Sequence, residues 1–199
     1  MTKQPIDIKI IEAGSNCYKS FYYLSDIIFT FDQNINEAMM NENFQILTTA
    51  EYNKLKDAIA LITILIAGAD GDVRQDELAW ASKVTKIRSY HMKEDMKDFY
   101  KEVGLNYSDK LDMYFETLPA SVEERTKIIS DSLSELNPIL EKLDKKVASR
   151  LYNSYLSFAE HVAKASGGFL GFFNINNEEV KFIKLPMIHS FLRQENEEE

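Results

Sequence analysis

One helix–turn–helix pattern occurs twice in the sequence and constrains the fold more than any other feature. In each copy an apolar helix is predicted to end at a glycine, the chain reverses, and a second helix opens with acidic residues. The first copy turns at Ala67-Gly68-Ala69-Asp70-Gly71 and the second at Ala163-Lys164-Ala165-Ser166-Gly167. Aligning Ala67 with Ala163 and Glu77 with Glu179 gives two equivalent units, the second with a six-residue insertion. An internal repeat of this kind predicts a helical bundle.

The rest of the chain shares this helical spacing of apolar residues. Only 7 glycines and 4 prolines interrupt 199 residues, 45% of which are hydrophobic, so one domain with a sizeable core is expected. We therefore predict a compact all-α bundle of about eight helices. The predicted helices cover residues 16–31, 48–67, 75–88, 93–103, 108–118, 121–136, 137–165 with a break near 143–144, and 176–185. The aromatic segment 16–31 also fits a strand, though less well.

Local sequence signals define where two of these helices begin. Thr48 with Glu51, and Ser121 with Glu124, match the capping box, in which each side chain satisfies an exposed backbone N–H. The segment 58–69 is apolar almost all round, which predicts a central buried helix. Further along, the residues expected in reach of the core are Leu78, Trp80, Ala81, Val84, Thr85 and Ile87.

Other residues mark expected interruptions of the helical pattern. Gly104 is predicted to stop one helix before another opens at Ser108. Asn137 before Pro138 fits either an N-cap followed by proline or a kink in one longer helix. The break near 143–144 is expected because a helix of about thirty residues would be long for a compact domain.

Composition limits the classes of partner and the cellular compartment. A net charge of −9 and a pI near 5.0 argue against nucleic-acid binding, which relies on clustered Lys and Arg. Cys17 is the only cysteine, so no intrachain disulfide is expected. The sequence shows no secretory signal, and its longest apolar run is too short for a transmembrane segment. We therefore expect a cytoplasmic protein.

The chain is predicted to have three parts. These are an N-terminal helical extension over 1–47 packed on the bundle, a helical domain over 48–192 and an acidic disordered tail over 193–199.

The two turns gather carboxylates that are candidate metal ligands. The candidates are Asp70, Asp72, Asp76 and Glu77 in the first turn and Glu178 and Glu179 in the second. Their mutual repulsion is relieved by a hard cation such as Ca²⁺ or Mg²⁺, by a helix N-terminus, or by neighbouring Lys and Arg. An EF-hand starting at Asp70 does not fit, because Gln75 stands where the loop needs glycine and Ala81 where it needs glutamate. The alternative is that these acids only complete the turns and start helices.

The turn motif carries a family resemblance. Ala-x-Ala-Asp-Gly-x-Val-x-x-x-Glu after an apolar helix, followed later by Ala-x-Ala-Ser-Gly and Ile-x-x-x-Glu, resembles the tellurite-resistance TerB-like family over about residues 50–190. The resemblance implies an all-helical bundle with internal pseudo-symmetry, metal binding near the turns, a role in tellurite resistance or stress responses, and no established enzymatic activity. It points to Asp70, Glu77 and Glu179 as metal ligands. Ser166 departs from the family pattern, which puts a symmetric two-turn metal site in doubt.

The insertion in the second turn is unusually apolar for a loop. Its large side chains are Phe169, Leu170, Phe172 and Phe173, flanked by Gly167 and Gly168. If the loop is exposed, we expect it to bind an unknown protein partner or to form a homodimer. If it folds back, it fills the gap between two helices.

Catalytic motifs are absent from the sequence. The three histidines, His91, His161 and His189, have no metal-binding spacing, and the sequence holds no P-loop, nucleophile elbow or dinucleotide fingerprint. We therefore predict a non-catalytic protein that binds a divalent cation at its acidic turns and acts in a bacterial stress or tellurite-resistance-type response. Two alternatives stay open: a metal-free interaction scaffold that uses the 167–173 loop, and an enzyme whose site assembles across helices.

Overall fold

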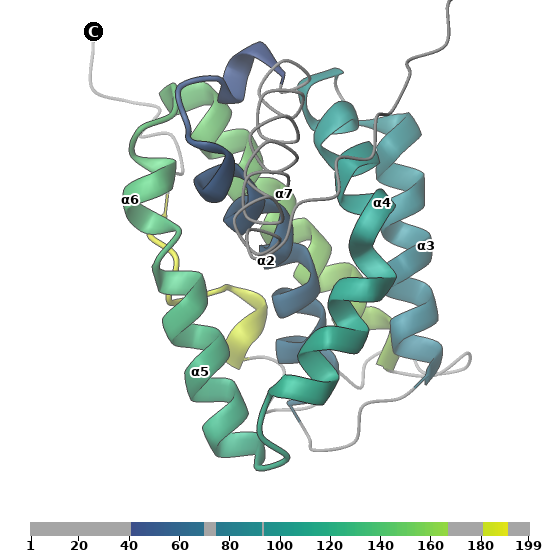
Figure 1. Ribbon diagram of the computed structural model, residues 1–199. Helices are drawn as coiled ribbons and strands as arrows, with labels where there is room; N and C mark the ends of the chain where they lie inside the picture. The colour runs from purple at the N-terminus through teal and green to yellow at the C-terminus, as the bar shows by residue number, and fades with distance from the viewer. Residues whose placement is uncertain (1–40, 70–74, 93, 167–180, 191–199) are drawn as a thin grey trace, which may run out of the picture. The chain divides into compact units, whose positions relative to one another are not determined.

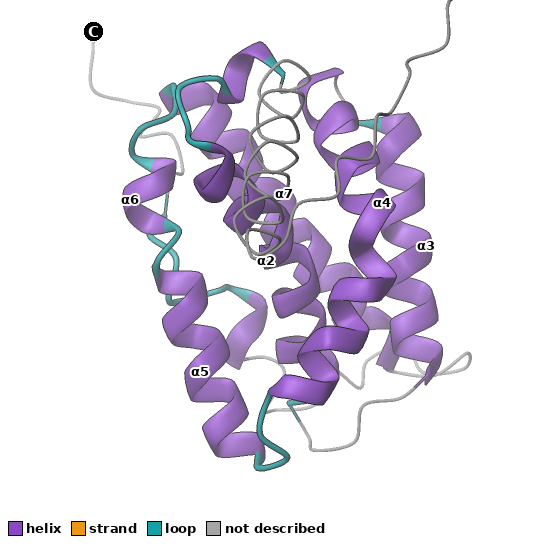
Figure 2. Ribbon diagram, in the orientation of Figure 1, coloured by secondary structure: helices purple, strands orange, loops and turns teal. Residues whose placement is uncertain are grey.

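The protein is all-helical over the residues that the structure, a computed structural model, describes. These are residues 41–69, 75–92, 94–166 and 181–190, and they contain no strand (Figure 2). The elements are a 3₁₀ turn η1 (Glu42–Phe44) and the helices α2 (Thr49–Ala67), α3 (Gln75–His91), α4 (Glu94–Thr117), α5 (Val122–Ser134), α6 (Asn137–Leu140) and α7 (Lys145–Ser166). The chain divides into two compact units, Met1–Met39 and Met40–Glu199, and all these elements belong to the second. The all-α prediction is confirmed for this part of the chain.

Helix α2 is the central helix of the second unit. It packs against α3, α4, α5 and α7, and it runs between them in Figure 1. From Ala58 to Ala67 every side chain is buried, as expected for a helix segment that is apolar on all its faces. The predicted central buried helix is therefore confirmed.

Both ends of α2 are fixed by local hydrogen bonds. At its start the predicted capping box is present, since Thr48 Oγ1 accepts the Glu51 N–H at 3.3 Å and the Glu51 carboxylate accepts the Thr48 N–H at 3.0 Å. At its end the Gly68 N–H bonds to the Ile64 carbonyl at 2.9 Å. Arg125 of α5 donates to the Gly68 carbonyl at 3.0 Å, so the helix end is tied to a neighbouring helix.

Helix α4 corrects the prediction that Gly104 stops a helix and that Ser108 opens another. The helix continues through both positions. Val103, Tyr107 and Leu111 are buried at helical spacing, so core packing outweighs the glycine's cost of about 1 kcal/mol. Gly104 itself is exposed, and a Cβ added there would meet nothing within 4 Å.

The α5–α6 connection also differs from both interpretations of Asn137. Helix α5 starts after Ser121, whose Oγ accepts the Glu124 N–H at 3.4 Å, so one of the two hydrogen bonds of the predicted capping box is present. The chain then breaks, and Asn137 becomes the first residue of α6 instead of its N-cap. Its amide instead reaches the C-terminal segment, donating to the Met187 carbonyl at 3.0 Å and accepting the His189 N–H at 2.8 Å. The predicted break near 143–144 is confirmed, because α7 begins at Lys145.

Two further predictions concern the whole chain. The count of about eight helices and the internal repeat stay predictions, because the second turn lies outside the described residues. No helix among the described residues has the length and apolar character that a membrane crossing requires.

Candidate functional site

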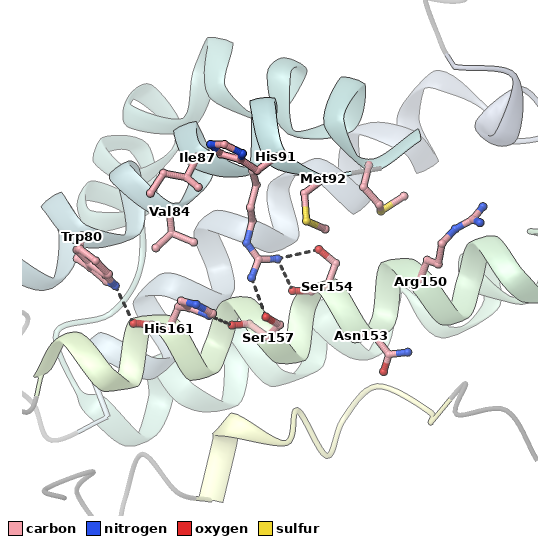
Figure 3. A pocket seen from close by; sticks show the side chains of 12 residues that line it. Trp80, Val84, Ile87, His91, Met92, Arg150, Asn153, Ser154, Ser157 and His161 are labelled. Atoms are coloured by element: carbon pink, nitrogen blue, oxygen red, sulfur yellow. Dashed lines mark hydrogen bonds between the residues drawn. The ribbon is translucent and has the colours of Figure 1, made fainter. Parts of the chain in front are cut away.

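A groove of about 790 Å³ lies between α3 and α7 (Figure 3). The two helices run antiparallel, because Trp80 of α3 contacts His161 of α7 while Arg88 contacts the earlier residues Ser154 and Ser157. Volumes of about 300–1,000 Å³ are typical of small-molecule sites. This groove is therefore the candidate functional site.

Helix α3 supplies an apolar wall of the groove. Trp80, Val84 and Ile87 recur at helical spacing, and Met92 and Met96 continue the wall beyond the helix end. Trp80 is 37% exposed and Ile87 is 43% exposed. The prediction that these two side chains belong to the core is thus wrong, whereas Ala81, Val84 and Thr85 are buried as predicted. Trp80 and Ile87 stay exposed because they line the groove, which is open between the two helices.

Helix α7 supplies a polar wall. Arg150, Ser154, Ser157 and His161 recur at helical spacing along the groove, with Asn153 beside them (Figure 3). The two walls thus differ in character, one apolar and one polar. Such a groove is suited to a molecule that has an apolar body and a polar group.

Arg88 connects the two walls. Its side chain is 7% exposed, and its Nη1 donates to the Tyr100 hydroxyl at 3.0 Å and to both the Ser154 carbonyl and Ser154 Oγ at 2.9 Å. Its Nη2 donates to Ser157 Oγ at 3.0 Å. The guanidinium also lies over two aromatic rings, 5.2 Å from the Tyr100 centroid and 5.5 Å from that of Phe158. These contacts fix the position of a buried positive charge.

The environment of Arg88 is unusual because its partners are neutral. Over the described ranges, no carboxylate lies within ion-pair distance of its guanidinium. A buried charge is normally paired, since removal from water is costly. Position in the last turn of α3 offsets part of this cost through the helix dipole. Burial also raises the pKa of the neighbouring Tyr100 hydroxyl, so this partner stays protonated and neutral.

The histidine at one end of the groove has a defined tautomer when neutral. His161 Nδ1 lies 2.6 Å from the Ser157 carbonyl oxygen, which only accepts, so Nδ1 carries the proton. The His161 carbonyl in turn accepts the Trp80 indole N–H at 3.0 Å. Ser157 Oγ has a guanidinium as its partner instead of an imidazole. The described hydrogen bonds therefore suit the binding of an anion better than activation of a serine nucleophile.

Most of the site residues predicted from the sequence fall outside the part of the chain that the structure describes. Asp70, Asp72, Glu178 and Glu179 lie outside the described residues, as do Phe169, Leu170, Phe172 and Phe173. Asp76 and Glu77 lie in the first turn of α3, where only the backbone is described. Within 41–69, 75–92, 94–166 and 181–190, no group of three or more His, Cys, Asp or Glu is arranged to hold a metal ion. The acidic-turn metal site stays a prediction.

The groove residues were not predicted from the sequence, although one signal was present. Arg150, Ser154, Ser157 and His161 recur at spacings of three and four residues on α7, and polar residues at helical spacing indicate a helix face that is not part of the apolar core. The position of Arg88 gave no comparable signal, because a lone arginine near a helix end usually complements the helix dipole.

No family model, curated protein or solved structure matches the chain. The TerB-like resemblance therefore stays a prediction from the turn motif. The interpretation of the groove rests on its own geometry, namely one apolar wall, one polar wall and a buried cation that joins them.

Proposed function

We propose that the chain is a non-catalytic binding protein whose groove between α3 and α7 holds a small molecule with an elongated apolar body. The observation that carries this proposal is the open apolar wall of α3. Trp80 and Ile87 face a groove of about 790 Å³ and are more than a third exposed, in the part of the chain where a core was expected. A ligand that covers this wall removes from water the apolar surface that the folded chain leaves exposed, and this burial favours binding.

The energetic basis of the proposal predicts how affinity depends on chain length. Burying one methylene group contributes about 0.8 kcal/mol, which is about fourfold in the dissociation constant. A site that recognises only a polar group shows no such dependence. A homologous series of alkyl chains therefore separates the two kinds of site.

Trp80 makes the test direct, because it is the only tryptophan in the chain and it lines the groove. Octanol, decanol and dodecanol, each titrated below its aggregation limit, should change the tryptophan emission. We expect affinity to rise by up to about fourfold per added methylene. Ile87→Asp should weaken binding, whereas Leu105→Asp, at a 78% exposed position on α4 outside the groove, should not. If calorimetry and fluorescence detect no binding for any chain length, the proposed function is wrong.

A further inference from the structure

We infer that the ligand of this groove is an aliphatic carboxylic acid whose carboxylate is bound by Arg88. The inference rests on the proposed function, because it adds a polar group to the same apolar ligand. Its starting point is the buried guanidinium, which is surrounded by hydroxyl and carbonyl oxygens and aromatic rings. An anionic ligand would supply the opposite charge that the described neighbours of Arg88 lack.

Arg88 has donor capacity for such a ligand. A guanidinium carries five N–H donors. Among the described residues, Tyr100 and Ser154 accept from Nη1, and Ser157 accepts from Nη2. The Nε–H and the second N–H of Nη2 therefore remain to donate to a ligand. Adjacent guanidinium donors match the two oxygens of a carboxylate, and such bidentate pairs are among the strongest hydrogen bonds in proteins.

The charge of the groove favours the same ligand. Two of its lining residues, Arg88 and Arg150, are positively charged, and two more are histidines, His91 and His161. None of the 12 described residues that line it is Asp or Glu, although the chain has 32 acidic residues and a net charge of −9. The groove is thus a basic site in an acidic protein, which attracts an anion locally. Because the cation lies against an apolar wall, a purely polar anion would leave that wall uncovered.

The cation is also held in place before a ligand arrives. Ser154 accepts from Arg88 through both its carbonyl and its hydroxyl, and its Oγ lies 2.8 Å from the Tyr100 hydroxyl. Tyr100 is fully buried and Ser154 is 4% exposed, so these partners are fixed by the core. Binding therefore loses little side-chain freedom at the charged contact.

The decisive measurement compares dodecanoate with dodecanol, which share the alkyl chain and differ in the head group. At about pH 8 the acid is ionised, and we expect it to bind at least about tenfold more tightly, as a charge-assisted hydrogen bond predicts. Equal affinities would overturn the assignment of a carboxylic acid and leave the proposed apolar site intact. Binding of neither compound would overturn both. A preference for dodecyl phosphate over dodecanoate would also overturn the carboxylate assignment.

Variants identify the residue responsible for the preference. Arg88→Met should reduce the acid-to-alcohol affinity ratio to about one, and Arg88→Lys should restore it only partly, because a lysine has no fork of donors. The matched control is Arg125→Met, since Arg125 binds the Gly68 carbonyl and does not line the groove. It should leave the ratio unchanged. A ratio that survives Arg88→Met in a folded protein would overturn the role of Arg88.

A second variant covers the case in which Arg88→Met does not fold. Ile87→Asp places a negative charge on an exposed side chain of the groove without removing a buried bond. It should weaken dodecanoate more than dodecanol, whereas Leu105→Asp should affect neither. An equal loss for the two ligands would count against recognition of an anion.

Discussion

At the scale of single residues, the same side-chain type has different roles in different surroundings. Lys142 and Arg88 are both cations near helix ends, but Lys142 pairs with the carboxylate of Glu51 at the protein surface. Arg88 has neutral partners in a buried position. The first arrangement is an ion pair between residues far apart in the sequence, whereas the second is a buried charge without an ion-pair partner among the described residues.

Glu51 gives a prediction of pH-dependent stability. Its hydrogen bond with Lys142, supported by the Thr48 N–H, lowers the pKa of its carboxyl from 4.5 to about 2. A depressed folded-state pKa stabilises the protein above the unfolded-state value, and this contribution disappears as the pH falls from 4.5 toward 2. Glu51→Gln keeps an acceptor for the capping box but loses the charge. We expect the variant to be less stable at neutral pH, by no more than about 1 kcal/mol because the pair is partly exposed.

Urea unfolding between about pH 7 and about pH 3 tests this linkage. The difference in unfolding free energy between wild type and Glu51→Gln should be constant at neutral pH and shrink below 4.5. Asp131→Asn, which removes the more exposed pair with Lys127, should have a smaller effect at neutral pH. A difference that does not change with pH would show that the Glu51 charge is not linked to folding.

At the scale of elements, the sequence predicted those features that depend on local chemistry. The capping box at Thr48 and the buried helix after it were predictable, because a cap needs only residues three apart and an all-apolar helix needs a core on every side. The continuity of α4 through Gly104 was not, because it depends on packing against α2 and α3. The groove was not predictable for the same reason, since it exists only once α3 and α7 are side by side.

Gly104 provides a prediction at this scale. It lies inside α4, is exposed, and has open space where a Cβ would stand. Gly104→Ala should therefore stabilise the protein by about 0.5–1 kcal/mol, because alanine has less backbone freedom to lose on folding. The matched control is Leu105→Ala at the next position, where both residues favour helix and the side chain is exposed, so we expect a change below about 0.5 kcal/mol. Chemical denaturation that finds Gly104→Ala neutral or destabilising would contradict a continuous helix.

At the scale of the whole second unit, long-range polar contacts join elements that the apolar core already packs together. Tyr155 of α7 donates to the Leu55 carbonyl of α2 at 2.7 Å, and Thr63 of α2 shares a 2.7 Å bond with Tyr107 of α4. These buried hydrogen bonds join α2, α4 and α7. Because α3 packs against α4 and α7, they also help to fix the helices that form the groove.

Asn137 makes separate long-range hydrogen bonds to the C-terminal segment, and these support the last prediction. Its amide bonds the Met187 carbonyl and the His189 N–H, while Leu185 and Ile188 are buried in the core. Asn137→Ala leaves both backbone groups without that partner, so we expect a loss of about 1–3 kcal/mol. Amide hydrogen exchange should rise first over residues 185–190, before it rises in α2, because the segment loses its anchor while the central helix keeps its packing.

Asn153→Ala is the control for this prediction. It removes an exposed amide whose bond to Ser149 is long at 3.4 Å, and it should leave exchange over residues 185–190 unchanged. Equal acceleration over α2 and residues 185–190 in Asn137→Ala would instead mean that the segment and the bundle unfold as one unit.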